Sequence, residues 1–203
     1  MDTITDTTPQ APERLPVIRP ERADGSDTGA IRALTAEAFA PPGKAVAPTS
    51  ARGRGAVVRE AGIIDALRES GALSYSLVAV HAGRIVGHAA ASPVTLDPDD
   101  GGRWYAVGPV SVHPEFRRQG TGSALMRALL DLLVVYGASG VVLFGDPSLY
   151  SRFGFEPRDG LTLAGPGPGA SQQFQALRLD GEPGVPTATV TYHPAFGDDR
   201  PER

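Results

Sequence analysis

The residues most able to do chemistry lie between Gly108 and Gly122, in the run GPVSVHPEFRRQGTG. A short β-branched segment precedes Arg117 and Arg118, a glycine-rich turn follows, and an apolar pattern of helical period comes next. This order predicts a strand, a turn and the first turn of a helix. The first N–H groups of a helix have no partner within it, and they attract anions. The run therefore predicts a phosphate-binding site.

The spacing separates this run from two common nucleotide-binding motifs. It departs from the G-x-G-x-x-G fingerprint, lacks an acidic residue suitably placed about 20 residues later, and lacks the Lys-Ser/Thr pair of a P-loop. Basic-x-x-Gly-x-Gly at a strand–helix junction instead resembles the pyrophosphate-binding signature of the GNAT acyltransferase superfamily. The segment from Tyr150 to Phe155 resembles the Tyr-x-x-x-Gly-Phe motif of the same superfamily, which follows the next strand.

Further segments narrow the resemblance. VVLFGDPSLYSRFGFEP, FQALRL and YHPAF, taken with the two motifs, resemble the YhbS-like branch of the GNAT N-acetyltransferases over residues 15–197. This resemblance implies transfer of an acetyl group from acetyl-CoA to an amine. It also implies an α/β fold with a GNAT-type mixed central sheet flanked by helices. Its N-terminal strands are antiparallel, and its fourth and fifth strands, here 104–112 and 140–145, are parallel and splayed apart.

The resemblance assigns cofactor-binding roles within the run. The glycines would let backbone N–H groups approach the pyrophosphate closely, and the two arginines would face phosphates, with a solvated surface pair as the alternative. The extended backbone near Val110 would pair with the pantetheine as an added strand does. The residues expected to bind acetyl-CoA are Val110, Ser111, Val112, Arg117, Arg118, Gln119, Gly120, Thr121, Gly122 and Ser123. No metal is expected.

Tyr150 is the candidate general acid. When an amine attacks a thioester, an oxyanion forms and a thiolate must leave. A phenol with a pKa of about 10 is protonated at neutral pH and can give its proton to that thiolate. An N–H group near Val112 could stabilise the oxyanion. The alternative reading of Tyr150 is an amphipathic tyrosine in the core of a short helix.

The general base is less evident from the sequence. Many GNAT relatives have a carboxylate on the fourth strand, but WYAVGPVSV contains none. Glu60, in the second expected helix, is a catalytic candidate beside the expected acceptor cleft. His88 and His113 are further candidates, although a lone histidine is more often structural. Water could also carry the proton outward.

The chemistry favours direct transfer in a ternary complex, because the chain has no cysteine to form the commonest acyl-enzyme. A second hypothesis is a non-catalytic CoA- or acyl-CoA-binding regulatory module, which would gain stability from CoA without releasing thiol. A third is a nucleotide-binding domain, which the missing Mg²⁺- and ribose-binding residues disfavour. The amine acceptor cannot be read from the sequence, although residues 40–55 and the segment after Gly160 are expected to line its site.

Hydrophobic periodicity predicts the elements that hold these residues. The hairpin turn is expected at residues 81–83, and the helix between the two parallel strands implies a crossover connection. Residues 24–28 offer caps for the first helix, and the Pro- and Gly-rich segment 40–55 predicts a loop. Strands are expected at 15–20, 74–80, 84–96, 104–112, 140–145, 174–179 and 187–192, and helices at 31–39, 57–70, about 121–136 and 147–154.

Composition limits the classes of protein that fit. The chain has 203 residues, 41% of them hydrophobic, which suits one N-acetyltransferase domain at 15–197 with tails at 1–14 and 198–203. A net charge of −4 gives no electrostatic reason to expect nucleic acid. No apolar run approaches the roughly 20 residues that span a bilayer, and the N-terminus does not resemble a secretory signal. We expect a cytoplasmic bacterial protein, monomeric or homodimeric.

Overall fold

The main sheet of the computed structural model has six strands in the order β1-β2-β3-β5-β6-β8. The structure describes residues 15–40, 51–157, 159–164 and 173–197, so the predicted tails at 1–14 and 198–203 lie outside it. Within this sheet all strand pairs are antiparallel except β5 and β6, which run parallel. The strands are β1 Val17–Pro20, β2 Tyr75–His81, β3 Arg84–Pro93, β5 Trp104–Val112, β6 Gly140–Phe144 and β8 Phe174–Arg178. The predicted mixed sheet is confirmed.

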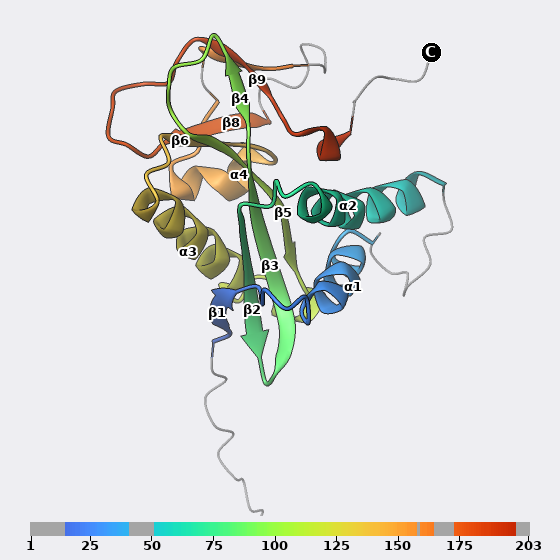
Figure 1. The fold of residues 1–203 in the computed structure, drawn as a ribbon. Coiled ribbons are helices and arrows are strands. Elements are labelled where there is room, and N and C mark those ends of the chain that lie inside the picture. The colour runs from blue at the N-terminus through green and yellow to red at the C-terminus, as the bar shows by residue number, and fades with distance from the viewer. Residues whose placement is uncertain (1–14, 41–50, 158, 165–172, 198–203) are drawn as a thin grey trace, which may run out of the picture.

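Helices cover both faces of this sheet (Figure 1). Helices α1 (Thr28–Ala38) and α2 (Ala51–Glu69) pack together on one face, and α3 (Thr121–Val135) lies on the other. α3 connects β5 to β6, which is the expected crossover between parallel strands. The short helix α4 (Pro147–Tyr150) follows β6 and continues into a 3₁₀ turn. Each functional segment thus follows the end of one of the two parallel strands.

Local chemistry explains the β2–β3 hairpin. Ala82 and Gly83 at its turn both have positive φ, 47° and 78°, which is the backbone that a tight hairpin turn requires. The N-terminus of α1 differs from expectation, because Asp27 stands at the N-cap but makes no capping hydrogen bond. Its carboxylate instead accepts from Arg19 at 2.6 and 3.0 Å and from the Arg22 N–H at 2.8 Å. These contacts lower the pKa of Asp27 to about 2, against the penalty of burial.

Two expectations for element bounds were wrong. Residues 84–96 do not form one strand: β3 ends at Pro93, and β4 (Thr95–Asp97) joins a second sheet of order β4-β9-β7. The other strands of that sheet are β7 (Leu161–Leu163), which was not predicted, and β9 (Ala188–Thr191). Residues 51–55, expected in a loop, begin α2, since alanine and arginine are good helix formers even beside glycine. Residues 41–50 of that expected loop lie outside the described residues.

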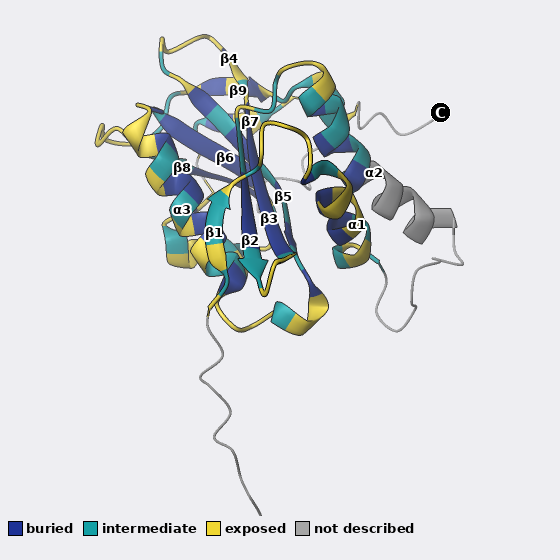
Figure 2. Cartoon of the chain, turned by 60° about the horizontal axis from the view of Figure 1, so that its bottom comes forward, coloured by how far each residue is buried: buried dark blue, intermediate teal, exposed yellow. Residues whose placement is uncertain are grey.

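Apolar residues of the strands and of the helices that cover them form cores on both faces of the main sheet (Figure 2). The largest cluster lies under α3 and includes Leu125, Leu129 and Phe155. A second cluster joins the main sheet to the small one and includes Trp104, which lies in the paired part of β5 and β6. Within the described part of the chain, no helix is long and apolar enough to cross a membrane.

Candidate functional site

A gap between β5 and β6 is the main feature of the site. These strands pair at only three positions, Trp104–Gly140, Tyr105–Val141 and Ala106–Val142. Strand β5 then continues for six more residues, to Val112, without pairing to β6. β6 is meanwhile paired along its length with β8 on its other side. Since β4 belongs to the second sheet, β5 and β6 are the fourth and fifth strands of the main sheet along the chain. The predicted splay between these two strands is confirmed.

The backbone of β5 faces this gap at alternate residues. The His113 N–H donates to Val86 O of β3 at 2.9 Å, so His113 is directed toward β3. Since backbone groups alternate along a strand, Val110 and Val112 direct theirs to the opposite edge, into the gap. Ser111 has its side chain buried instead, and its hydroxyl donates to Thr35 Oγ1 at 3.2 Å. Of these strand residues, Val110 and Val112 direct their backbone groups into the gap.

The start of α3 offers a row of backbone donors beside the end of β5. The first bond within the helix runs from Ala124 N to Gly120 O at 2.9 Å, so the N–H groups of residues 120–123 have no acceptor in the helix. Gly120 is the N-cap, with φ of 90°, and no side chain caps this end. A Cβ on Gly122 would lie 3.4 Å from Val112 Cγ2, so the helix start packs against the strand end. The predicted strand–turn–helix is confirmed.

The polar side chains of the turn have different surroundings. Arg117 donates from Nε to Val112 O at 3.0 Å and from Nη2 to Ala38 O at 2.7 Å, so its guanidinium ties the end of β5 to the end of α1. Gln119 donates to Glu115 O at 2.5 Å, which braces the turn. Arg118 is exposed, with φ of 60°, beside the start of α3. Arg118 is therefore better placed than Arg117 to meet an incoming anion.

Tyr150 lies just beyond the end of β6. Asp146 caps α4 by accepting from the Ser148 N–H at 2.9 Å, and Gly154, with φ of 89°, ends the following 3₁₀ turn. The phenol ring is half-buried and packs edge-on to Phe155, with ring centroids 6.2 Å apart. Burial raises the pKa of Tyr150 above its ordinary value. The phenol is therefore protonated at neutral pH, as a general acid must be.

Two residues that sequence reasoning missed hold Tyr150 in place. A Cβ on Gly145 would lie 2.5 Å from Tyr150 Cε2, so the ring rests directly on the backbone of Gly145. Gln175, buried on β8, donates from Nε2 to Gly145 O at 3.0 Å and fixes that backbone. A glycine at the end of a buried strand often indicates that another group approaches the backbone closely, so the sequence contained a signal for Gly145. Gln175 carries no comparable signal, because its partner is 30 residues away.

The three candidate bases have different surroundings in the structure. His113 is buried at the end of β5, where Nδ1 accepts from the Glu115 N–H at 3.3 Å and Nε2 lies 2.6 Å from Arg84 Nη2. That geometry gives His113 a capping role. Glu60 lies half-buried on α2, and its role as a base stays a prediction. His88 is buried within β3, facing the same side of the sheet as Ser111.

Comparison with known proteins assigns the family. Residues 47–155 match the acetyltransferase (GNAT) family model, and this chain belongs to that family. It is 40% identical over 140 residues to the uncharacterized N-acetyltransferase YhbS of Escherichia coli K12, covering 68% of this chain and 83% of YhbS.

Two solved structures extend this likeness to the fold. Escherichia coli YhbS in complex with CoA superposes with a TM-score of 0.75 at 32% identity, covering 94% of this chain and 97% of that one. A GNAT family acetyltransferase from Brucella melitensis in complex with acetyl-CoA gives a TM-score of 0.69 at 37% identity, covering 91% and 99%. Both structures thus share this fold over nearly the whole chain.

Proposed function

We propose that this protein transfers the acetyl group of acetyl-CoA to an amine acceptor by direct attack in a ternary complex. One observation carries the proposal: β5 and β6 separate after three paired residues, which leaves an unpaired backbone edge on β5 that leads to the free N–H groups at the start of α3. The protonated phenol of Tyr150 follows the end of β6. Membership of the GNAT family supports it, as do the acetyl-CoA and CoA complexes of the two similar structures.

The gap suits an extended ligand that ends in phosphates. Amide groups of the pantetheine would pair with the backbone of Val110 and Val112 as an added strand does. Arg117 already binds Val112 O, so pairing there would use the N–H of Val112 and both backbone groups of Val110. The pyrophosphate would meet the N–H groups of residues 120–123, with Arg118 beside them. These contacts hold the thioester without contributing to bond breaking.

Tyr150 would supply the proton that the leaving thiolate needs. Attack of the amine nitrogen on the thioester carbon forms the C–N bond and an oxyanion, which a β5 N–H can stabilise. Collapse breaks the C–S bond and Tyr150 protonates the sulfur. The nitrogen loses one proton as the amide forms, and this proton restores the phenol. Its raised pKa keeps the proton on the phenol until the thiolate forms. The chain has no cysteine, which fits attack by the amine itself without a cysteinyl intermediate.

A combined binding and turnover experiment tests the proposal. Acetyl-CoA and CoA should raise the melting temperature, whereas ATP and NAD should not, because the donors of the site match an extended pantetheine. A panel of polyamines, lysine derivatives and peptides with free amino termini, assayed for thiol release from acetyl-CoA, should contain a substrate. Stabilisation by CoA without thiol release from any amine would favour the non-catalytic CoA-binding module. Stabilisation by ATP or NAD alone would overturn both.

We also expect a cytoplasmic location, as a monomer or homodimer, with acetyl-CoA and the amine as the partners. Among the described residues no three metal-binding side chains gather. The predicted domain, 15–197, contains all the described elements from β1 to the last 3₁₀ turn at Pro194–Phe196. Limited proteolysis with mass spectrometry would test these bounds, and sedimentation would give the oligomeric state.

A further inference from the structure

Two exposed arginines share the ring of Phe153 on the α3 side of the sheet. Arg152 and Phe153 belong to the 3₁₀ turn that follows α4, whereas Arg127 lies on α3. The guanidinium carbon of Arg127 is 5.9 Å from the centroid of the Phe153 ring, and that of Arg152 is 5.2 Å from it. Both arginine side chains face solvent. Two positive charges thus gather at one aromatic ring.

Phe153 gives these arginines a fixed support. Its ring is half-buried and packs against the hydrophobic cluster under α3 that contains Leu125 and Leu129. The negative face of an aromatic ring attracts a guanidinium, which keeps its N–H donors available while it lies over the ring. The ring therefore holds both guanidiniums in place and leaves their donors for another group.

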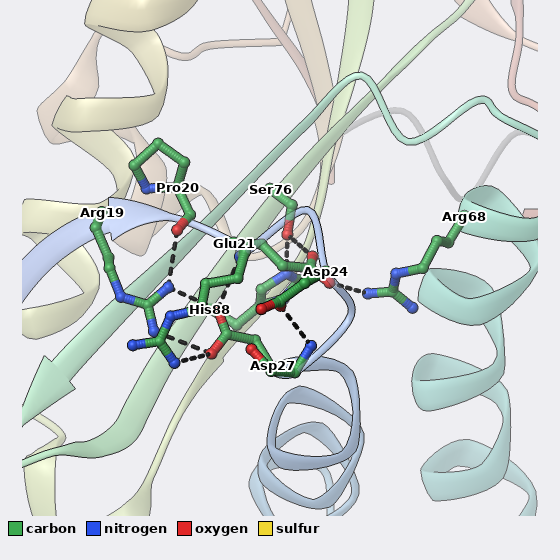
Figure 3. Close-up of polar contacts among 10 residues, drawn as sticks. Arg19, Pro20, Glu21, Asp24, Asp27, Arg68, Ser76 and His88 are labelled. Carbon is green, nitrogen blue, oxygen red and sulfur yellow. Dashed lines mark hydrogen bonds and ion pairs between the residues drawn. The ribbon is translucent and has the colours of Figure 1, made fainter.

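No carboxylate among the described residues matches the charge of this pair. Arg19 shows the contrast, because it donates to Asp27 at 2.6 and 3.0 Å (Figure 3). Neither Arg127 nor Arg152 forms an ion pair with a residue that the structure describes, and this includes Asp131, one turn beyond Arg127 on α3. The pair thus combines uncompensated positive charge with hydrogen-bond donors, which is the chemistry that recognises a phosphate.

Arg127 lies on the same face of α3 as the start of the helix. Residues three and four positions apart share a helix face, so Gly120, Ala124 and Arg127 form one line, and all three are exposed. At a rise of about 1.5 Å per residue, Arg127 is roughly 10 Å along the axis from Gly120. Helical side chains lean toward the N-terminus, which shortens this separation for the guanidinium. The arginine pair therefore follows the proposed pyrophosphate site along an exposed surface.

The contact between Arg127 and Phe153 also joins the elements that follow the two splayed strands. Helix α3 comes directly after β5 and its turn, and the 3₁₀ turn comes after β6 and α4. One arginine is thus supplied from each side of the gap, on the face of the sheet where α3 lies. A ligand that extends from the gap past the start of α3 would reach this pair next.

We propose that Arg127 and Arg152 bind the 3′-phosphate of CoA. This inference rests on the proposed function, since it takes CoA as the ligand. The 3′-phosphate and the 5′-diphosphate are attached to the same ribose, so a diphosphate at residues 120–123 keeps the 3′-phosphate close by. A phosphate monoester, with a second pKa of about 6, carries nearly two negative charges at neutral pH. Two guanidiniums match that charge and offer paired N–H donors to its oxygens.

Two ligands that differ only in this phosphate test the site. Isothermal titration would compare CoA with 3′-dephospho-CoA, and we expect the wild type to bind CoA about 10-fold more tightly. Arg127→Gln and Arg152→Gln should each reduce this ratio to about threefold, and the double variant should reduce it to about one. The Kd of 3′-dephospho-CoA should stay within about twofold of its wild-type value in all three variants, because that ligand has no group for the arginines.

Two other arginines provide matched controls. Arg118→Gln, beside the start of α3, should weaken both ligands by the same factor and preserve the ratio, because both ligands carry the diphosphate. Arg32→Gln removes an equal charge from α1, on the opposite face of the sheet, where Arg32 lies 3.3 Å from Asp65. It should change neither Kd.

The outcomes separate this site from the proposed function. Equal affinity of the wild type for the two ligands, or an unchanged ratio in both Arg127→Gln and Arg152→Gln, would overturn the phosphate assignment. Binding of neither ligand by the wild type would overturn the proposed function and this inference with it. The expected ratios without thiol release from any amine would support the phosphate site and count only against acetyl transfer.

³¹P NMR of bound CoA tests the site without a substitution. Nearby positive charge favours the ionised form of a phosphate, so the bound 3′-phosphate should titrate with a second pKa below that of free CoA. In the double variant the pKa should return toward the free value. A 3′-phosphate that titrates in the wild-type complex as it does in free CoA would overturn the assignment, because the group would then face solvent.

Discussion

Gly145→Ala is a sensitive test of how Tyr150 is positioned. The new Cβ would lie 2.5 Å from Tyr150 Cε2, 3.2 Å from Cδ2 and 3.5 Å from Cζ. Carbon atoms pack at roughly 3.5–4.0 Å, so the near edge of the ring must move by about 1 Å. Phe155 packs against the same ring, and Gln175 holds the Gly145 carbonyl, so the backbone has little freedom to move instead.

The expected result is a loss of turnover without a loss of cofactor binding. Misplacing a catalytic group by about 1 Å can cost on the order of 100-fold in rate, and we expect that fall in kcat. CoA affinity, measured by isothermal titration, should change less than about threefold, because the gap and the α3 N-terminus are untouched. Steady-state thiol release would give kcat.

Gly29→Ala is the matched control for Gly145→Ala. Gly29 is exposed on α1, a Cβ added there would point into open space, and alanine favours helix, so activity should be unchanged and stability slightly raised. Full activity in Gly145→Ala would refute the reasoning, since the ring position would then not matter. A large fall in CoA affinity with unchanged kcat would refute it equally, because the glycine would then serve the cofactor.

Three further predictions address other parts of the site and the fold. Tyr150→Phe should lower kcat about 10²- to 10⁴-fold with little change in CoA affinity, measured by thiol release and titration, and unchanged turnover would remove Tyr150 as the general acid. Gly120→Ala, at φ of 90°, should cost about 1–2 kcal/mol in stability and weaken CoA binding, measured by thermal melting with and without CoA; an unchanged Kd would contradict the pyrophosphate assignment. Asp27 has a folded pKa of about 2, below its unfolded value of 3.8, so it stabilises the protein above pH 3.8 and this contribution is lost as pH falls toward 2. Asp27→Asn should therefore lower the free energy of unfolding by roughly 1–2 kcal/mol at pH 7 and by much less near pH 2, and a loss that does not depend on pH would contradict the ion-pair account.

Local sequence signals predicted the elements that carry the site. The residues at 117–122 indicate a turn and a helix start because glycine permits positive φ, and Gly120 has that backbone. The hairpin at 81–83 was predicted for the same kind of reason. Such features depend on neighbours in the chain, so the sequence reports them directly.

Features that depend on distant pairing were not predictable. Strand β3 passes into β4 because β9, nearly 100 residues away, pairs with it, and nothing between Pro93 and Thr95 reveals that partner. A hydrogen-bonded chain from Arg68 through Glu21 and Ser76 to His88 joins residues 47, 55 and 12 positions apart. A single sequence offered His88 as one candidate base, and only the fold brings a carboxylate into contact with it through Ser76.

Mass spectrometry of the reaction product tests the central claim most directly. The purified protein would be incubated with acetyl-CoA and the amine panel, with the Tyr150→Phe variant alongside as a reference for enzyme-dependent transfer. The account predicts an acetylated amine and free CoA in equal amounts, at a rate far above that of the variant. Binding of acetyl-CoA with no acetylated amine and no free CoA from any member of the panel would contradict it.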